Sequence, residues 1–258
     1  MARRIVDRHI LHLIKAWLVV PVEDDDGKGG TARSRANRNN KKGTPQGAPI
    51  SPLMSNLYMR RFVEGWRRLG FQQRWSAHIV NYADDFVICC KRGAAEAAVA
   101  MRTIMMRLKL AVNEDKTHLC QLPRERFDFL GYTFGRCYSR QDGHAYIGTR
   151  PSQKSIKRMV ESISEVTDRR KTLLDAGVIV GRLNRKMIGW ANYFCLGPVG
   201  PAYCLLDTHA RQRLRRWLCA KHKVASTGMS RFPDVYLTEV LGLVRLAPRT
   251  RNLPWARV

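Results

Sequence analysis

The chain has few acidic residues. Its 258 residues include 21 Asp and Glu against 46 Lys and Arg, which gives a formal net charge of +25. Such an excess of one sign destabilises a compact fold through self-repulsion and is typical of proteins that bind polyanions. The composition therefore favours a nucleic-acid partner.

Long apolar runs and metal-binding cysteine patterns are also missing. A membrane span needs about 18 consecutive apolar residues, and no stretch of the sequence reaches this length. The first residues do not lead into a secretory signal. The seven cysteines are scattered without a Cys-x-x-Cys pair, and the seven histidines show no ligand spacing. We therefore expect a reduced, cytoplasmic protein with no membrane partner, no disulfide framework and no zinc site.

Basic residues, in contrast, gather in two clusters that contain no acid. The first lies within residues 33–42. The second is a candidate RNA-binding set of six residues, Arg211, Arg213, Arg215, Arg216, Lys221 and Lys223. A basic run is often only a solvated face, but the arginines here are expected to point away from Leu214 and Trp217, which favours RNA contact.

The apolar spacing of the first half predicts helices over residues 5–18, 51–66 and 94–110. Ser51 is expected to cap the second helix, with Pro52 at its first position. Residues 23–42 are polar and Gly-rich, which predicts a loop or mobile arm. Phe127–Phe134 alternates like a single strand. Helices behind an antiparallel sheet are expected, which is an α+β arrangement.

The second half has a different pattern. Helical spacing over residues 154–166, 178–195 and 202–219 leaves basic residues on the opposite faces, and a short helix is expected at 234–241. The sequence thus predicts two domains, an α+β domain in residues 1–150 and an all-helical domain with a positive surface in residues 151–258.

The tetrapeptide Tyr82-Ala83-Asp84-Asp85 is the strongest chemical signal. Apolar, β-rich runs flank it on both sides, which predicts a β-hairpin with two carboxylates at its tip. Adjacent carboxylates repel each other unless something positive, such as a divalent metal ion, lies against them. Taken alone, the four residues are explained more simply by an ordinary solvated acidic turn.

Two further segments contain residues that could take part in binding or catalysis. Gly43–Pro52 is a Gly- and Pro-rich turn that leads into a helix N-terminus, a place suited to phosphates or base edges, although a simple turn explains it equally well. Lys116 follows a strand-like segment around Val112, where its cation could neutralise a leaving pyrophosphate. An exposed lysine at the end of a strand is the ordinary alternative.

Together these segments resemble the reverse transcriptases encoded by group II introns. The resemblance covers most of the chain and rests on motifs in the family's order and spacing: Thr44–Pro52, Tyr82–Asp85, Leu110–Thr117, Phe127–Gly131, Leu183–Phe194 and Leu214–Lys223. It implies a partial polymerase palm in residues 1–150, followed by an all-α thumb or maturase domain. The implied function is RNA-directed DNA polymerase with intron maturase activity in RNA splicing.

The resemblance also implies a role for each matching residue. Asp84 would be a ligand of the catalytic Mg²⁺ ions, Asp85 a second ligand or an electrostatic support, and Lys116 would face the leaving phosphates. The nucleotide and template pocket would be lined by Gln46, Gly47, Pro49 and Tyr82. The primer grip would be formed by Phe129, Leu130 and Gly131.

Partners and location follow from the same resemblance. The implied partners are group II intron RNA, a template RNA and a DNA primer, and a homodimer is compatible with the resemblance. The implied location is the bacterial cytoplasm or nucleoid. A non-catalytic RNA-binding maturase stays open as the alternative, as does an inert gene fragment.

The chain departs from the family's pattern at its start. The family's site needs a further carboxylate on a palm strand before the helix that we expect at residues 5–18, and Met1 stands immediately before this helix. The acids at 23–26 follow the helix in a polar segment and cannot replace that carboxylate. An incomplete metal site typically loses orders of magnitude in rate. The chain alone is therefore expected to extend primers poorly or not at all.

Overall fold

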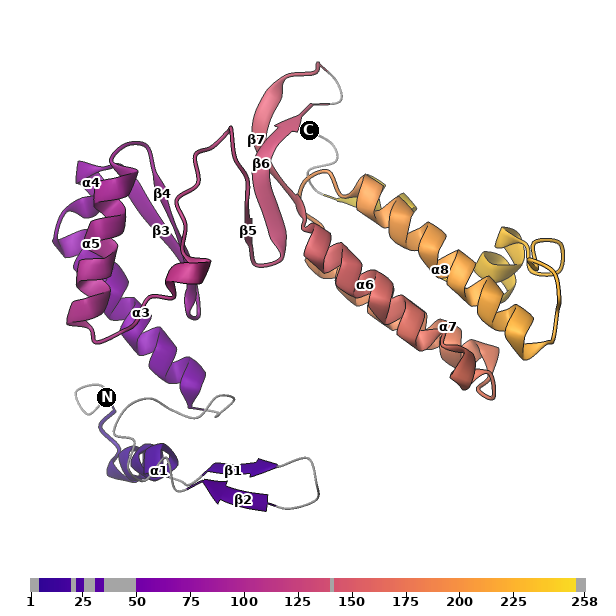
Figure 1. Cartoon of the computed structure of the whole chain (residues 1–258), viewed down its shortest axis with the longest axis horizontal. Helices are drawn as coiled ribbons and strands as arrows, with labels where there is room; N and C mark the ends of the chain where they lie inside the picture. Colours follow the sequence, from indigo (N-terminus) through magenta and orange to yellow (C-terminus); the bar gives the residue numbers. More distant parts are fainter. Residues whose placement is uncertain (1–4, 20–21, 26–30, 35–49, 140–141, 254–258) are drawn as a thin grey trace. The chain divides into compact units, whose positions relative to one another are not determined.

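The computed structural model describes residues 5–19, 22–25, 31–34, 50–139 and 142–253, and the chain divides into two compact units, Met1–Leu119 and Cys120–Val258 (Figure 1). The first unit contains α1 Arg8–Val19, β1 Val22–Asp25, β2 Thr31–Ser34, α3 Ser51–Arg68, α4 Phe71–Arg74, β3 Ala77–Tyr82, β4 Asp85–Cys90, α5 Ala94–Arg107 and the 3-10 turn η1 Glu114–Lys116. The second contains β5 Phe127–Phe129, β6 Tyr132–Tyr138, β7 Ala145–Pro151, α6 Gln153–Val166, η2 Arg169–Lys171, α7 Ala176–Tyr193, α8 Gly200–Lys221, the π-turn η3 Tyr236–Val240 and η4 Ala247–Asn252. The predicted α+β class is confirmed.

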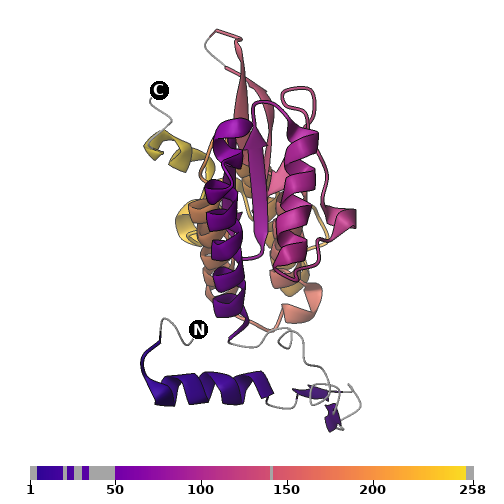
Figure 2. The same ribbon diagram turned by 90° about the vertical axis from the view of Figure 1, so that its left-hand side faces the viewer.

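The core of the first unit lies between the helices α3 and α5 and one face of the β3–β4 hairpin. Figure 2 shows the two helices running side by side. Their buried side chains, among them Phe62, Trp66 and Met101, meet the inward residues of the antiparallel strands. Because side chains alternate along a strand, the inward set Ala77, Ile79 and Ile88 leaves every second residue on the opposite face.

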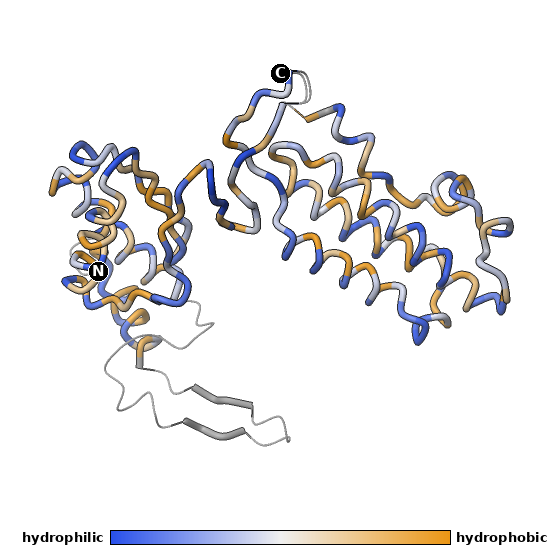
Figure 3. Tube along the Cα trace, turned by 45° about the horizontal axis from the view of Figure 1, so that its top comes forward, coloured by the Kyte–Doolittle hydropathy of each residue, from blue (hydrophilic) through white to orange (hydrophobic). Residues whose placement is uncertain are grey.

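The second unit combines a three-stranded antiparallel sheet, in the order β5-β6-β7, with a bundle of α6, α7 and α8. Apolar residues from all three helices form its core, including Ile163, Leu183 and Leu214, each fully buried. In Figure 3 hydrophobic and hydrophilic residues alternate along the turns of these helices, as expected for helices with one buried face. The three predicted helices are confirmed. The short helix expected at 234–241 is present as the five-residue π-helix Tyr236–Val240.

Three local predictions are wrong. Ser51 is not the N-cap of α3, because Ile50 occupies this position and makes no side-chain cap, and Pro52 is accordingly the second helical residue rather than the first. Part of the segment predicted as a loop forms the short antiparallel pair β1–β2, with Glu23 opposite Arg33. Backbone pairing satisfies N–H and C=O groups whatever the side chains. The third error is Phe127–Phe134, which is a hairpin rather than one strand.

None of the described helices is both long and apolar enough to cross a lipid bilayer.

Candidate functional site

Asp84 and Asp85 lie at the tip of the β3–β4 hairpin, as the sequence predicts. Tyr82 and Asp85 form the last pair of the ladder, and Ala83 and Asp84 make the turn. Ala83 has φ 52°, a backbone conformation that costs free energy for a residue with a Cβ. Both carboxylates are exposed, and the Tyr82 side chain is 65% exposed beside them. The turn thus presents both acids to solvent.

The opposite end of the hairpin is fixed to the core. There the Trp66 indole N–H donates to the Ala77 carbonyl over 3.1 Å. Nearer the tip, Phe86 follows Asp85 in β4, and its ring lies 5.1 Å from the Phe62 ring. Trp66 and Ala77 are essentially buried. The packed base holds the acidic tip on a rigid element, and such support is what a metal or catalytic site requires.

Asp84 and Asp85 fit a magnesium ion in part. Neither aspartate has an ion pair or hydrogen bond within the portion of the chain that the structure describes, so their repulsion is left for a cation to relieve. Mg²⁺ commonly binds through one or two carboxylates together with water and substrate phosphates. No group of three or more His, Cys, Asp or Glu side chains able to hold a metal occurs among the described residues. The tip can therefore supply two ligands.

Lys116 ends the short turn η1 in the same unit. Asn113 caps this turn, with its side-chain oxygen accepting from the Lys116 N–H over 3.2 Å. Arg102 makes a bidentate contact with Glu114, which lowers the pKa of that carboxyl and raises the pKa of the guanidinium. Lys116 itself is exposed and forms no ion pair with Asp84 in the described part of the chain. The segment before it is not part of a sheet.

Three of the predicted pocket residues, Gln46, Gly47 and Pro49, lie outside the described residues. The helix that follows them begins at Ser51 and is described throughout. Their role in a nucleotide pocket stays a prediction.

The predicted primer grip is the turn of the β5–β6 hairpin. Leu130 and Gly131 both have positive φ, 50° and 79°, which is the pattern of a two-residue hairpin turn. The Tyr193 hydroxyl donates to the Leu130 carbonyl over 2.9 Å, and the Ser155 hydroxyl donates to the Gly131 carbonyl over 2.9 Å. A Cβ at Gly131 would lie 3.0 Å from the Phe194 ring, so glycine is favoured here by both its positive φ and its lack of a side chain. The turn is tied to the helical bundle.

Aromatic residues of the bundle complete this attachment. Tyr132 packs against Phe194 with ring centroids 5.0 Å apart, and its hydroxyl accepts from the Cys195 N–H. Burial raises the pKa of Tyr132, and burial likewise raises the pKa of Tyr203 to about 12. The Tyr203 hydroxyl lies 2.9 Å from the carbonyl oxygens of both Ala191 and Phe194. Trp190 packs on Phe194 at 4.6 Å, as expected for residues one helical turn apart.

Four of the six predicted RNA-binding residues have partners within the protein. Arg215 is buried, its Nε–H donates to the Phe232 carbonyl over 2.8 Å, and its guanidinium pairs with Asp234. The expectation that Arg215 points away from the core is therefore wrong. Arg211 also pairs with Asp234. Internal carbonyls or hydroxyls accept hydrogen bonds from Arg213 and Lys221.

The other two, Arg216 and Lys223, are exposed and face a groove of about 530 Å³. Arg169, which is not among the residues predicted from the sequence, lines the same groove together with Trp217. Arg169 belongs to the short basic run Arg169–Lys171, more than 40 positions before Arg216, and only the fold brings this run to the same groove. Arg213 also lines the groove, which thus brings together four cations from η2, α8 and the segment after α8, although the Arg213 side chain is hydrogen-bonded within the protein.

An acid and an amide that the sequence did not single out hold the C-terminal segment. Asp207 is buried and accepts from the Leu246 and Ala247 N–H groups, which caps η4. The Asn184 amide donates to the Gly242 carbonyl over 2.8 Å, and its oxygen accepts from the Val244 N–H. These residues are structural rather than RNA-facing.

Comparison with known proteins gives two family matches. The model of the reverse transcriptase (RNA-dependent DNA polymerase) family matches residues 2–134, just over half of the chain. The model of the group II intron maturase-specific domain matches residues 156–232. The chain is also similar to "Protein YkfC" of Escherichia coli (strain K12), with 26% identity over an alignment of 184 residues; the match covers 59% of this chain and 46% of that protein. The chain thus spans less than half the length of this curated relative.

Proposed function

The chain belongs to the reverse transcriptase family, of the type found with group II introns, and we propose from this that it takes part in RNA-directed DNA synthesis and in the splicing of intron RNA. The observation that carries the first role is the hairpin tip, where Asp84 and Asp85 stand exposed on a rigid support with no cationic partner among the described residues. We place this activity in the bacterial cytoplasm or nucleoid, where intron RNA and DNA meet.

In this proposal Asp84 and Asp85 would hold Mg²⁺, and the bound ion would activate the primer 3′-hydroxyl and stabilise the leaving pyrophosphate. Tyr82, on the same outward face as Asp85, offers an aromatic surface beside the acids. Lys116 would neutralise phosphate charge. The nucleotide and template base would meet Gln46, Gly47 and Pro49, and the β5–β6 turn would contact the primer.

The splicing role needs an RNA-binding surface. The groove with Arg169, Arg216 and Lys223 supports it, because these exposed cations have no side-chain partner among the described residues and can contact phosphates at no cost to the fold. Arg215 is left out of this surface because its charge is already paired with Asp234.

The hairpin assignment is tested with Asp84→Asn in two measurements, primer extension on an RNA template and Mn²⁺ binding by electron paramagnetic resonance. We expect a low extension rate, because the described residues offer two carboxylates, and a further loss of about 100-fold in the variant. The matched control is Glu96→Gln, which removes one exposed negative charge from the first turn of α5.

Metal binding or extension that survives Asp84→Asn would contradict the assignment. So would the absence of both signals in the unaltered chain. A loss of equal size in Glu96→Gln would show that net charge, rather than the hairpin tip, is responsible.

A further inference from the structure

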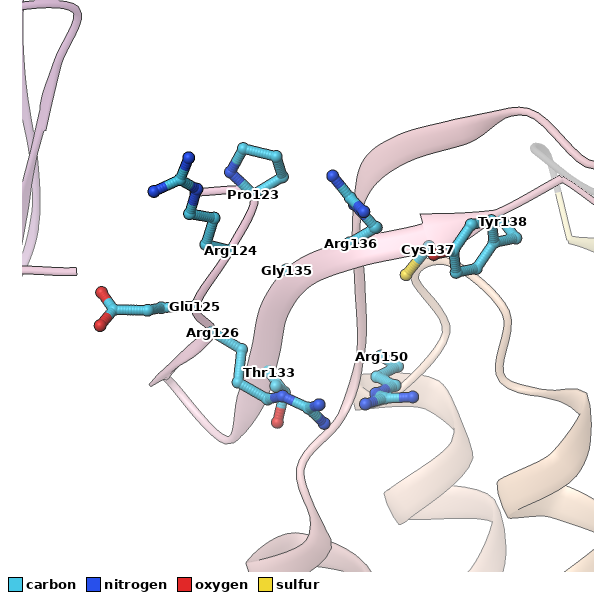
Figure 4. A pocket seen from close by; sticks show the side chains of 10 residues that line it. All are labelled: Pro123, Arg124, Glu125, Arg126, Thr133, Gly135, Arg136, Cys137, Tyr138 and Arg150. Carbon is cyan, nitrogen blue, oxygen red and sulfur yellow. The ribbon is translucent and has the colours of Figure 1, made fainter. Parts of the chain in front are cut away.

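A cavity of about 280 Å³ lies on the sheet of the second unit, between β6, β7 and the loop that precedes β5. Four arginines line it: Arg124, Arg126, Arg136 and Arg150 (Figure 4). In this view Arg124 and Arg136 lie on either side of Pro123, whereas Arg126 and Arg150 lie together beside Thr133. Neither the hairpin tip nor the basic groove of the bundle includes these residues.

The four guanidinium groups have no charge partner among the described residues. All four side chains are exposed, and none of them forms an ion pair or a hydrogen bond in that part of the protein. Glu125 is the one acid that lines the cavity, but its carboxylate accepts from the Gln121 N–H over 2.6 Å and points away from the arginines in Figure 4. An arginine stays charged at any physiological pH, so the cavity carries unrelieved positive charge.

One further acid lies on this side of the sheet. Asp128 is paired in register with Thr133, and the Thr133 hydroxyl donates to its carboxylate over 2.5 Å. Asp128 does not line the cavity. One hydrogen-bonded carboxylate outside the cavity cannot neutralise four guanidinium groups within it.

Local structure fixes the positions of the arginines. The loop before β5 closes on itself, because the Glu125 N–H donates to the Gln121 carbonyl while the Gln121 N–H donates to the Glu125 side chain. Arg126 lies over Gly135, where a Cβ would come within 3.0 Å of the Arg126 Cβ. Arg150 is in register with Thr133 and so shares this face. The cations are arranged on a sheet and a closed loop rather than on a mobile arm.

We propose that Arg124, Arg126, Arg136 and Arg150 bind successive phosphates of a nucleic-acid strand. Guanidinium groups match phosphate in bidentate geometry, and several of them around one cavity, with Arg150 and Arg136 projecting from opposite faces of the sheet, suit a repeating polyanion better than a single ion. The site rests on the proposed function for the identity of its partner, but it needs neither the metal nor the hairpin tip.

The test is fluorescence anisotropy with a labelled RNA strand and with the same strand in an RNA–DNA duplex, between about 50 and 200 mM salt. The full chain is compared with a variant in which the four arginines are replaced by glutamine, which keeps the side-chain stems. Each lost phosphate contact lowers the slope of log K against log salt by about one, so the slope falls by about 3 to 4. Affinity at about 0.1 M salt falls more than roughly 100-fold.

A charge-matched variant serves as the control, because any loss of four positive charges weakens nucleic-acid binding to some degree. It replaces four exposed arginines of α3 and α5 by glutamine: Arg61, Arg67, Arg68 and Arg107. The double variant R136Q/R150Q leaves the closed loop intact and serves as a second test in case the fourfold variant misfolds. Its slope of log K against log salt should fall by about 2.

Equal losses in the test and control variants, or an unchanged slope in the test variant, would overturn the site. Displacement of the RNA by millimolar inorganic phosphate, beyond the effect of chloride at equal ionic strength, would also overturn it, because a single-ion site would then explain the cavity. If the unaltered chain binds neither nucleic acid, this site and the proposed function fail together. If binding depends on Arg216 and Lys223 alone, only this site fails.

Discussion

Arg215 and Arg216 are neighbours with the same charge, and the structure gives them opposite roles. Arg215 is buried between α8 and the C-terminal segment, where it bonds the Phe232 carbonyl and pairs with Asp234. Arg216 is exposed at the basic groove. Replacing each in turn by methionine removes the same charge and keeps a similar apolar stem. We expect Arg215→Met to destabilise the protein and Arg216→Met to weaken RNA binding.

The cost of Arg215→Met has two parts. The Phe232 carbonyl loses its hydrogen bond inside a buried region, at about 1–3 kcal/mol. The lost ion pair adds about 1 kcal/mol, because the Asp234 side chain is 49% exposed and keeps Arg211 as a partner. The free energy of unfolding should therefore fall by about 2–4 kcal/mol, equivalent to roughly 5–12 °C in Tm. Arg216→Met should change it by less than about 0.5 kcal/mol.

Urea unfolding followed by circular dichroism measures the first effect, and RNA anisotropy well below Tm measures the second. The salt slope should fall by about one in Arg216→Met and stay unchanged in Arg215→Met. Equal stabilities of the two variants would refute the burial argument. A loss of RNA affinity in Arg215→Met, with the fold intact, would refute the separation of the two roles.

Two further predictions concern the second unit. Gly131→Ala should cost about 1–3 kcal/mol, because it adds strain at φ 79° and a Cβ 2.9 Å from the Ser155 hydroxyl, whereas Gly143→Ala, at φ 71° in open space, should cost only the backbone strain. Equal unfolding free energies of these variants would contradict the packing argument. Burial, helped by the nearby Arg213 charge, lowers the pKa of His209, so the fold favours neutral imidazole. This stability is present above the ordinary histidine pKa and is lost as pH falls through it towards the folded pKa, so Tm should drop less on acidification to about pH 5 in His209→Gln than in the unaltered chain.

Much of the fold follows from the sequence, because apolar periodicity decides which face of an element is buried. The three helices of the bundle and the acidic hairpin are placed correctly for this reason. The errors lie where a second surface is buried. Along α8 the apolar stripe that contains Leu214 faces α6 and α7, but the segment around Phe232 covers Arg215 from another side. The apolar periodicity of α8 does not predict that this segment covers Arg215.

The site shows the same division. The position of Asp84 and Asp85 at a hairpin tip depends on local strand pattern and turn length, which the sequence displays. The arginine-lined cavity depends instead on pairing between strands. Arg126 and Arg150 are 24 residues apart in the chain and come together only because Gly135 and Thr133 of β6 lie between them. A scan for consecutive basic residues cannot detect such a surface.

The β5–β6 turn could have been predicted from the sequence, because the alternation of apolar residues changes phase there. In a continuous strand Phe127 and Phe129 would share a face with Thr133, but the apolar residues after the turn are Tyr132 and Phe134, one position out of phase. A two-residue turn at Leu130 and Gly131 restores the phase and puts the aromatic residues on one face, where Phe127 and Phe134 stack at 5.3 Å. Because a slip of one residue would turn every aromatic side chain to the other face, the phase change itself predicts the turn. It also implies that a primer contact at this place would be made by a strained loop rather than by a strand.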